Sequence, residues 1–412
     1  MKMKKIRIAV LLVVAWFAVG AEACTSVLVS GRATADGRPL LLKNRDTDDL
    51  DNLNIIGRGS KYRYLAIVAA SDLPGESTWS GHNEKGFAII NTAAYNLNVV
   101  DGKMAHDDGQ DGKVMRHALG LCATLADFEL YIDSLKNAGV LNCNSNFGVI
   151  DAQGGCAYYE VGNRGFVKFD ANDPAVAPNG YLVRTNFGYT GLHTLDQGVE
   201  RFQAITDLTA AASAQGRLSW KFLLREVPRH LTHGLTQVNL HDLEPADDSK
   251  PVFANLRDFI PRYYTASAVV IQGVKKGENA LATVTWTISG SPLTTVALPL
   301  VLTPTGLLPH TVTRNAAGYA PLVHAGLDLK HRLFPNDRGN GHDYIDVSKL
   351  INKRQTGILQ KVRVIEDETL RRGEAMVEDW RKYLSEASVK TYDDWFDAYV
   401  SEQYARQFGV EL

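Results

Sequence analysis

The residue with the clearest potential for chemistry is Cys24, because it directly follows a segment with the features of a cleavable signal peptide. Four basic residues precede an unbroken apolar run over residues 8–19, and Ala21 and Ala23 provide the small side chains that a signal peptidase reads. We therefore expect residues 1–23 to be removed and the protein to be periplasmic or secreted. Cys24 would then carry a thiol and a free α-amine on one residue.

An amino-terminal cysteine holds both halves of a nucleophile–base pair. The α-amine has a reference pKa near 8, so a useful fraction is neutral near pH 7 and can accept the proton of the thiol. The thiolate that results is the effective nucleophile. On position alone, a cysteine that merely follows a signal peptide is the commoner explanation, so the interpretation depends on the residues that the fold brings beside Cys24.

A predicted hairpin brings charged groups back to this cysteine. Two strands, at residues 25–30 and 40–43, are joined through an Asp-Gly turn signal. The second strand runs into Lys43-Asn44-Arg45-Asp46, so Asp46 and a cation return to the start of the first strand. A carboxylate there can orient the α-amine, and a cation can stabilise the thiolate. Taken alone, these charges fit a solvated strand end equally well.

The pattern Cys-Thr-Ser, Asp-Gly, Lys-Asn-Arg-Asp resembles the opening of the linear-amide carbon–nitrogen hydrolases of the N-terminal-nucleophile type. That group includes choloylglycine hydrolases, penicillin V acylases and isopenicillin-N acyltransferases. Three later segments agree and follow in the order of the family: residues 81–88 (GHNEKGFA), Arg184-Thr185-Asn186 and Pro261-Arg262-Tyr263. The resemblance covers roughly residues 24–290, and the spelling of residues 83–88 is closer to the acyltransferase-like branch.

The resemblance implies a role for each matching residue. Cys24 would be the nucleophile and, through its amine, the base, while Asp46 would hold that amine. The Asn186 side chain would donate to the oxyanion alongside a backbone N–H within residues 91–94, and such donors stabilise an acyl-transfer transition state by a few kcal/mol each. Arg262 would support the polar network. The implied chemistry needs no metal and no organic cofactor.

The sequence departs from the family pattern at Lys43, where the family usually has arginine. Lysine keeps the charge but loses the planar, two-pronged donor geometry. Either Lys43 takes over the contact to the thiolate, or Arg45 does. A family position that is normally asparagine or tyrosine falls near Ala93, which leaves the loop that faces the substrate undetermined.

The elements that must position these residues indicate an α+β fold. Helical spacing of apolar residues predicts one helix over residues 114–137, whereas the Pro-, Gly- and His-rich run 304–340 predicts irregular structure. The other expected elements are strands at 62–70, 86–91, 146–151, 156–161, 181–185 and within 263–303, and helices at about 195–213, 219–231, within 345–384 and at 391–406.

The family resemblance makes the expected fold a four-layer αββα sandwich, with Cys24 at the end of an inner strand. We expect a signal peptide at 1–23, a catalytic domain at 24–305 and, at 306–412, an irregular segment plus a helical C-terminal extension packed on that domain. The extension lies outside the resemblance, and the sequence assigns it no role.

Composition limits the partners. The formal charge is −2 for the chain and −5 after residues 1–23 are removed, since these hold four basic residues and one acidic residue. This balance argues against a nucleic-acid partner, and no later apolar run is long enough to span a membrane. A small-molecule amide remains the expected substrate. The sequence does not decide between a monomer and a homo-oligomer, or whether Cys143 and Cys156 form a disulfide or stay buried thiols.

Three other functions compete with the hydrolase. Cys24 could be the lipidated residue of a surface-anchored binding lipoprotein, although Glu22 fits a lipidation site poorly. A metal-dependent hydrolase would need a ligand motif such as His-Glu-x-x-His, and the eleven histidines are scattered. A serine hydrolase would need Gly-x-Ser-x-Gly, which is absent from the sequence.

Overall fold

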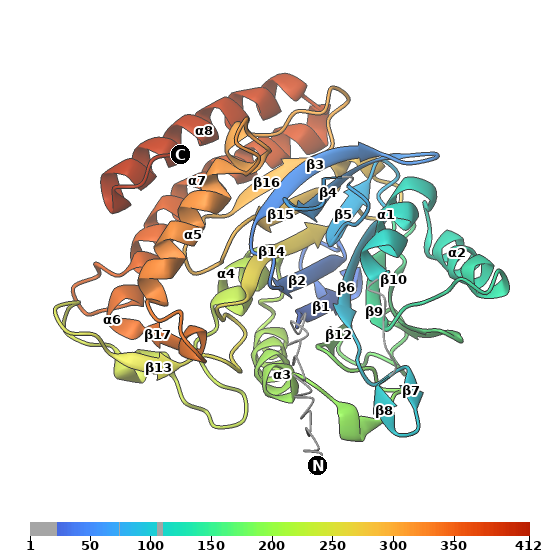
Figure 1. Cartoon of the computed structure of the whole chain (residues 1–412). Coiled ribbons are helices and arrows are strands. Elements are labelled where there is room, and N and C mark those ends of the chain that lie inside the picture. Colours follow the sequence, from blue (N-terminus) through green and yellow to red (C-terminus); the bar gives the residue numbers. More distant parts are fainter. Residues whose placement is uncertain (1–22, 74, 105–109) are drawn as a thin grey trace, which may run out of the picture.

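Two antiparallel sheets form the centre of the molecule in a computed structural model that describes residues 23–73, 75–104 and 110–412 (Figure 1). Sheet A has the order β12-β1-β2-β14-β15-β16, with bounds Tyr181–Arg184, Thr25–Val29, Leu40–Asp46, Thr265–Gln272, Val284–Ile288 and Leu298–Val301. Sheet B has the order β11-β10-β9-β6-β5-β4-β3, with bounds Gly165–Asp170, Cys156–Gly162, Ser145–Ile150, Ala88–Ala93, Ser80–Asn83, Arg63–Ala69 and Asn52–Arg58. Residues 1–22 lie outside the described residues, so the signal peptide stays a prediction.

The two sheets pack face to face through a buried apolar layer. Leu28, Leu41 and Ile271 from sheet A meet Ile90 and Tyr158 from sheet B, and all five side chains are fully buried. Successive side chains of a strand point to opposite faces, so the neighbouring residues of β1 and β2 face outward. One face of strands β1 and β2 therefore meets sheet B and the other faces the outer helices. The hairpin that carries Cys24 is thus an inner part of the sandwich, as expected.

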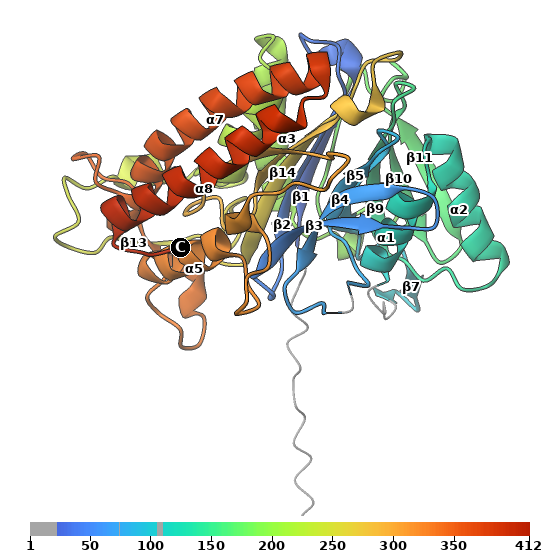
Figure 2. The same cartoon turned by 90° about the horizontal axis from the view of Figure 1, so that it is seen from above.

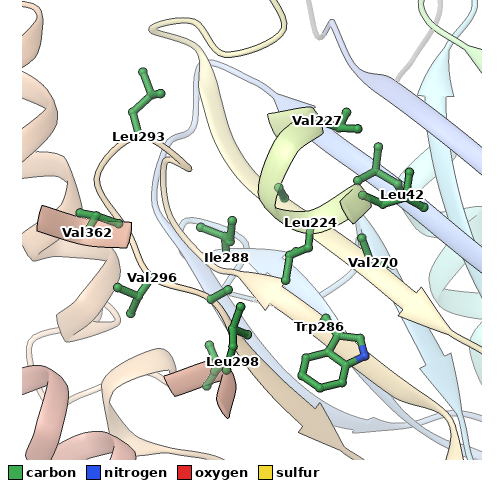
Figure 3. Close-up of a cluster of buried hydrophobic side chains, with 14 of the residues drawn as sticks. Leu42, Leu224, Val227, Val270, Trp286, Ile288, Leu293, Val296, Leu298 and Val362 are labelled. Atoms are coloured by element: carbon green, nitrogen blue, oxygen red, sulfur yellow. The ribbon is translucent and has the colours of Figure 1, made fainter. Parts of the chain in front are cut away.

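Helices cover the outer face of sheet A. Figure 3 shows Val270, Trp286 and Ile288 of this face around Leu224 of α4, while Val362 of α7 lies beside Val296 in the same cluster. Trp220 at the start of α4 stacks on Trp286 with ring centroids 3.5 Å apart. The helices of this layer are α3 (Val199–Ala214), α4 (Trp220–Glu226), α5 (Pro321–Leu333), α6 (Val347–Leu350), α7 (Ile358–Tyr383) and α8 (Glu386–Phe408).

Two helices, α1 (Asp111–Leu121) and α2 (Leu125–Asn137), cover the outer face of sheet B. The prediction of one continuous helix over 114–137 is wrong, because Thr124 caps a new helix. Its side chain accepts from the Asp127 N–H, and the Asp127 carboxylate accepts from the Thr124 N–H. Reciprocal capping of this kind begins a helix. Seen from above, the layers run α7 and α8, sheet A, sheet B, α1 and α2 (Figure 2), which confirms the αββα sandwich.

The C-terminal segment is more ordered than its composition predicts. Helix α5 lies inside the run expected to be irregular, and it begins at Pro321 because proline lacks the N–H that a first helical residue leaves unused. Strand β17 (Tyr344–Asp346) pairs with β13 (Phe253–Asn255), and the long helix begins only at Ile358. Helix α7 packs on β16 and α8 packs on α7. The domain boundary at 305 stays a prediction.

The remaining features complete the fold. A two-stranded hairpin, β7 (Val99–Val100) with β8 (Lys103–Met104), follows the end of β6.

Cys143 packs in the cluster under α1 and α2, whereas Cys156 packs between the sheets, on the other face of sheet B. This separation agrees with buried thiols rather than a disulfide. Among the described helices, none is both long and apolar enough to cross a membrane.

Candidate active site

The candidate site lies where β1 begins and its two neighbours end. Strand β1 pairs Ser26 with Lys43 of β2 and with Arg184 of β12. Continuing both ladders by two residues puts Arg45 across from Cys24 on one side and Asn186 across from it on the other. The Ser26 and Tyr158 hydroxyls are 2.8 Å apart across the two sheets, so by alternation Cys24 belongs to the inward face. Cys24 is 5% exposed.

Arg201 of α3 links the cysteine to the asparagine. Its guanidinium donates to the Cys24 carbonyl at 2.6 Å, to Thr25 Oγ1 at 3.0 Å and to Asn186 Oδ1 at 2.8 Å. Burial and the neighbouring Arg262 lower the pKa of Arg201 to about 10, while negative charge on Asp46 and Cys24 opposes the shift. Arg201 is thus a buried cation within electrostatic reach of Cys24, and it fixes which end of the Asn186 amide donates.

The Asn186 amide points its nitrogen at the end of β6. Nδ2 donates to the Ala93 carbonyl at 3.0 Å. The next residue, Ala94, donates its N–H at 2.6 Å to the carbonyl of Asn144, the residue just before β9. Because N–H groups alternate in direction along a strand, the Ala93 N–H points away from β9, to the side where the Asn186 amide lies. Of residues 91–94, Ala93 therefore has the backbone N–H best placed to act together with Asn186.

A second network surrounds Asp46, whose side chain is fully buried. Its carboxylate accepts from Arg262 Nε at 2.7 Å, from Thr265 Oγ1 at 2.7 Å and from Asn44 Nδ2 at 3.1 Å. Arg262 also donates to the Ala23 carbonyl at 3.3 Å. The acid and its arginine therefore lie against the Ala23–Cys24 peptide, the bond whose cleavage would release the α-amine.

The two cations that the sequence left as alternatives have different partners. Lys43 Nζ donates to Asn91 Oδ1 at 2.6 Å and to the Trp79 carbonyl at 2.8 Å. Arg45 donates to Asn52 Oδ1 at 2.6 Å, and its guanidinium lies 4.7 Å from the centre of the Trp79 ring. Both side chains face sheet B. The strand register favours Arg45 as the neighbour of Cys24, and the assignment of the thiolate contact stays a prediction.

The structure brings the expected residues Cys24, Asp46, Asn186 and Arg262 to one end of the sandwich, with Lys43 in an adjoining network. Sequence reasoning missed Arg201. A signal for it exists: Arg201 lies on the buried face of α3 with Ala204 and Ile205, and a charged residue at an apolar helical position is unusual. Within the described ranges, no group of three or more His, Cys, Asp or Glu side chains is arranged to hold a metal ion.

Solved structures of other proteins resemble this fold at low sequence identity. Penicillin V acylase from Agrobacterium tumefaciens is 14% identical with a TM-score of 0.39, and the match covers 68% of this chain and 86% of that one. The N-acylethanolamine-hydrolyzing acid amidase ortholog from Caenorhabditis elegans is 16% identical with a TM-score of 0.34, covering 51% and 89%. A variant of conjugated bile acid hydrolase from Clostridium perfringens is 12% identical with a TM-score of 0.35, covering 68% and 92%.

Two of these structures, the penicillin V acylase and the conjugated bile acid hydrolase, carry the names of enzyme groups that the sequence motifs resemble. No protein-family model matches the sequence, and no curated protein matches it either. Identities and TM-scores this low say nothing of the chemistry of this chain.

Proposed function

We propose that this protein is an exported amidohydrolase that cleaves a linear amide through a thioester on Cys24. The observation that carries the proposal is the environment of Cys24. Cys24 directly precedes an inner strand, its carbonyl is bound by the buried Arg201, and Asn186 and Arg45 lie at the register positions on either side. A buried cysteine with only a packing role would need none of these polar neighbours.

In the first half of the reaction, the α-amine of mature Cys24 accepts the thiol proton and the sulfur attacks the amide carbonyl. The tetrahedral oxyanion is stabilised by Asn186 Nδ2, which has two N–H groups, and by the Ala93 N–H. Collapse breaks the carbon–nitrogen bond, and the α-ammonium returns its proton to the leaving amine. The products of this half are a free amine and a Cys24 thioester.

In the second half, the same α-amine removes a proton from water, and the hydroxide attacks the thioester. The carbon–sulfur bond breaks, the carboxylic acid leaves, and Cys24 recovers its proton. Asp46 accepts a hydrogen bond from the α-amine in both halves, while Arg262 Nε donates to the same carboxylate and holds it in place. An amine in place of water would give acyl transfer by the same steps, so the two activities differ only in the second nucleophile.

The amino terminus tests the proposal, because any residue or acyl group left on the α-amine removes the base. We expect intact mass and N-terminal sequencing of the exported protein to give residues 24–412 with unmodified Cys24. A diacylglyceryl-sized excess on Cys24 would identify a lipoprotein and end the hydrolase proposal. Activity of a preparation that still begins before Cys24 would contradict the mechanism.

A panel of amides tests the reaction itself. Conjugated bile acids, penicillin V and N-acyl amino acids, each incubated with and without an added acceptor amine, would separate hydrolysis from transfer by their products. Cys24→Ser should be folded and exported but have little or no activity on any substrate that the wild type cleaves, because a hydroxyl is far less acidic and less nucleophilic than the thiol that this site holds. Near-wild-type turnover by Cys24→Ser would remove Cys24 from the mechanism.

A further inference from the structure

The segment after residue 305, to which the sequence assigns no role, contacts the Arg262 motif directly. Tyr263, the neighbour of Arg262, stacks on His342 with ring centroids 3.8 Å apart and an interplanar angle of 3°. Phe334 meets the same ring edge-on at 5.5 Å. Lys330 Nζ lies 4.8 Å from the centre of that ring. Three residues of the C-terminal segment thus surround one residue of the active-site motif.

Lys330 also reaches the backbone beneath Asp46. Its side chain comes from α5 and is 0% exposed, and Nζ donates to the Thr265 carbonyl at 3.2 Å. Burial lowers the pKa of Lys330 to about 7, while the Asp46 carboxylate opposes the shift. Ammonium and neutral amine both carry N–H donors, so the bond to Thr265 forms in either state.

The carbonyl that Lys330 binds belongs to an irregular point in sheet A. The pairing of β14 with β2 shifts between Thr265 and Ser267, as at a β-bulge. Bulges interrupt the ladder and redirect side chains, and a buried carbonyl at such a point needs a donor from elsewhere. Lys330 is that donor. The same residue, Thr265, turns its hydroxyl to Asp46 Oδ1 at 2.7 Å and accepts from the Arg262 N–H at 3.0 Å.

We propose that Lys330 is a positioning residue of the active site, through which the C-terminal segment holds the Thr265 bulge and with it the Asp46–Arg262 pair. This inference rests on the proposed function, since Asp46 matters only if it orients the α-amine of Cys24. Burying an amine costs free energy that an apolar side chain of similar size would avoid. The hydrogen bond at the bulge, rather than packing, explains why a lysine occupies this buried position.

The experiment compares Lys330→Met with Lys330→Arg in the mature enzyme. Lys330→Met should lower kcat at least tenfold with little change in KM, because the Asp46–amine contact serves proton transfer rather than substrate binding. It should also slow alkylation of Cys24 by iodoacetamide near neutral pH and shift the pH profile of that reaction. The charged group that acts on Lys330 is the Asp46 carboxylate, which is paired with Arg262, so the shift reports on this pair. Lys330→Arg, which keeps a donor, should retain more activity.

Lys361 provides a matched control. Its Nζ donates to the Gln407 carbonyl at 3.3 Å and lies 5.9 Å from the centre of the Phe408 ring, far along the chain from the active-site motifs. Lys361→Met removes the same kind of contacts and should leave kcat and Cys24 alkylation unchanged. Equal losses in the Lys330 and Lys361 variants would mean that Lys330 serves only the stability of the C-terminal segment, which would overturn the proposal.

Thr265→Val completes the test, because it removes the hydroxyl that links the bulge to Asp46 while keeping the side-chain shape. If Lys330 acts through Thr265, the two substitutions together should lower kcat by less than the product of their separate effects. If Lys330→Met does not fold, the turnover of Lys330→Ala can be measured with and without added propylamine. Propylamine replaces the missing part of the side chain, so it should raise the turnover of Lys330→Ala more than that of the wild type. The inference would be overturned if Lys330→Met had the kcat of the wild type. It would also be overturned if the effects of Lys330→Met and Thr265→Val on kcat simply multiplied in the double variant.

The two proposals fail differently. Turnover that survives Cys24→Ser refutes the proposed function, and the inference falls with it. Turnover that depends on Cys24 but not on Lys330 refutes only the inference.

Discussion

Arg201 donates a hydrogen bond of 2.6 Å to the main-chain carbonyl of Cys24. The contact fixes the backbone of the proposed nucleophile from a helix that lies 177 residues further along the chain. The same guanidinium holds Asn186 Oδ1, so one side chain aligns the proposed nucleophile with the proposed donor for the oxyanion.

Substitution of Arg201 should therefore damage chemistry more than substrate binding. Bonds to a charged donor contribute about 1.5–3 kcal/mol each, and Arg201→Lys cannot make all three at once. We expect kcat to fall by about 10- to 100-fold in Arg201→Lys and further in Arg201→Met, measured with urea midpoints to account for lost stability. Arg217→Met, at an exposed arginine just after the end of the same helix, should be neutral. Unchanged kcat in a folded Arg201→Met would exclude this alignment role.

Asn186→Ala tests the oxyanion assignment. Since the oxyanion exists only in the transition state, kcat should fall by about 100-fold while KM changes little. Asn172 gives a control, because its exposed amide also donates to a backbone carbonyl, that of Gly154 at 2.9 Å. Steady-state kinetics of both variants provide the measurement. A change confined to KM would make Asn186 a residue for substrate binding or for structure.

Lys43 and Arg45 can be separated by the reactivity of Cys24. A cation beside the sulfur lowers the pKa of the thiol, so removing the cation in contact should raise the apparent pKa of alkylation. The strand register puts Arg45 opposite Cys24 and Lys43 opposite Ser26, so Arg45→Ala should give the larger shift. A larger shift in Lys43→Ala would assign the contact to Lys43, as in the family pattern. No shift in either variant would leave Arg201 as the cation that acts on the sulfur.

His82 should make the protein sensitive to acid. Its ring joins the two sheets through a contact of 2.8 Å between Nδ1 and Thr285 Oγ1, and burial lowers its pKa from 6.5 to about 3. Below pH 6.5 the unfolded chain binds a proton that the folded chain does not. Stability is therefore lost as the pH falls from 6.5 to 3, with a slope approaching about 1.4 kcal/mol per pH unit from this residue.

Urea unfolding at pH 7 and pH 4.5 provides the measurement for this prediction. His82→Gln, which cannot titrate, should lose less stability between the two values than the wild type, whereas the exposed His331→Gln should behave as the wild type does. An equal loss in His82→Gln would mean that His82 does not contribute to the acid sensitivity.

Local pattern was enough to predict much of the architecture. The Asp-Gly turn and the flanking apolar runs set a hairpin whose observed register pairs Thr25 with Asn44, and apolar spacing found the long C-terminal helix. The single helix over 114–137 was wrong because periodicity continues across Thr124, where only the cap marks a new start. Helix α5 was missed because proline marks irregular structure in most contexts but is accepted at a first helical turn.

The sequence alone determined which residues are proposed to carry the chemistry, because Cys24 and the short motifs around Asp46, Asn186 and Arg262 are each readable within a few residues. Only the tertiary structure decided what holds them in place. Arg201 and Lys330 reach the site from helices that are distant in sequence, through bonds to the main-chain carbonyls of Cys24 and Thr265. A main-chain carbonyl is the same group in every residue, so no sequence motif records which side chain binds it.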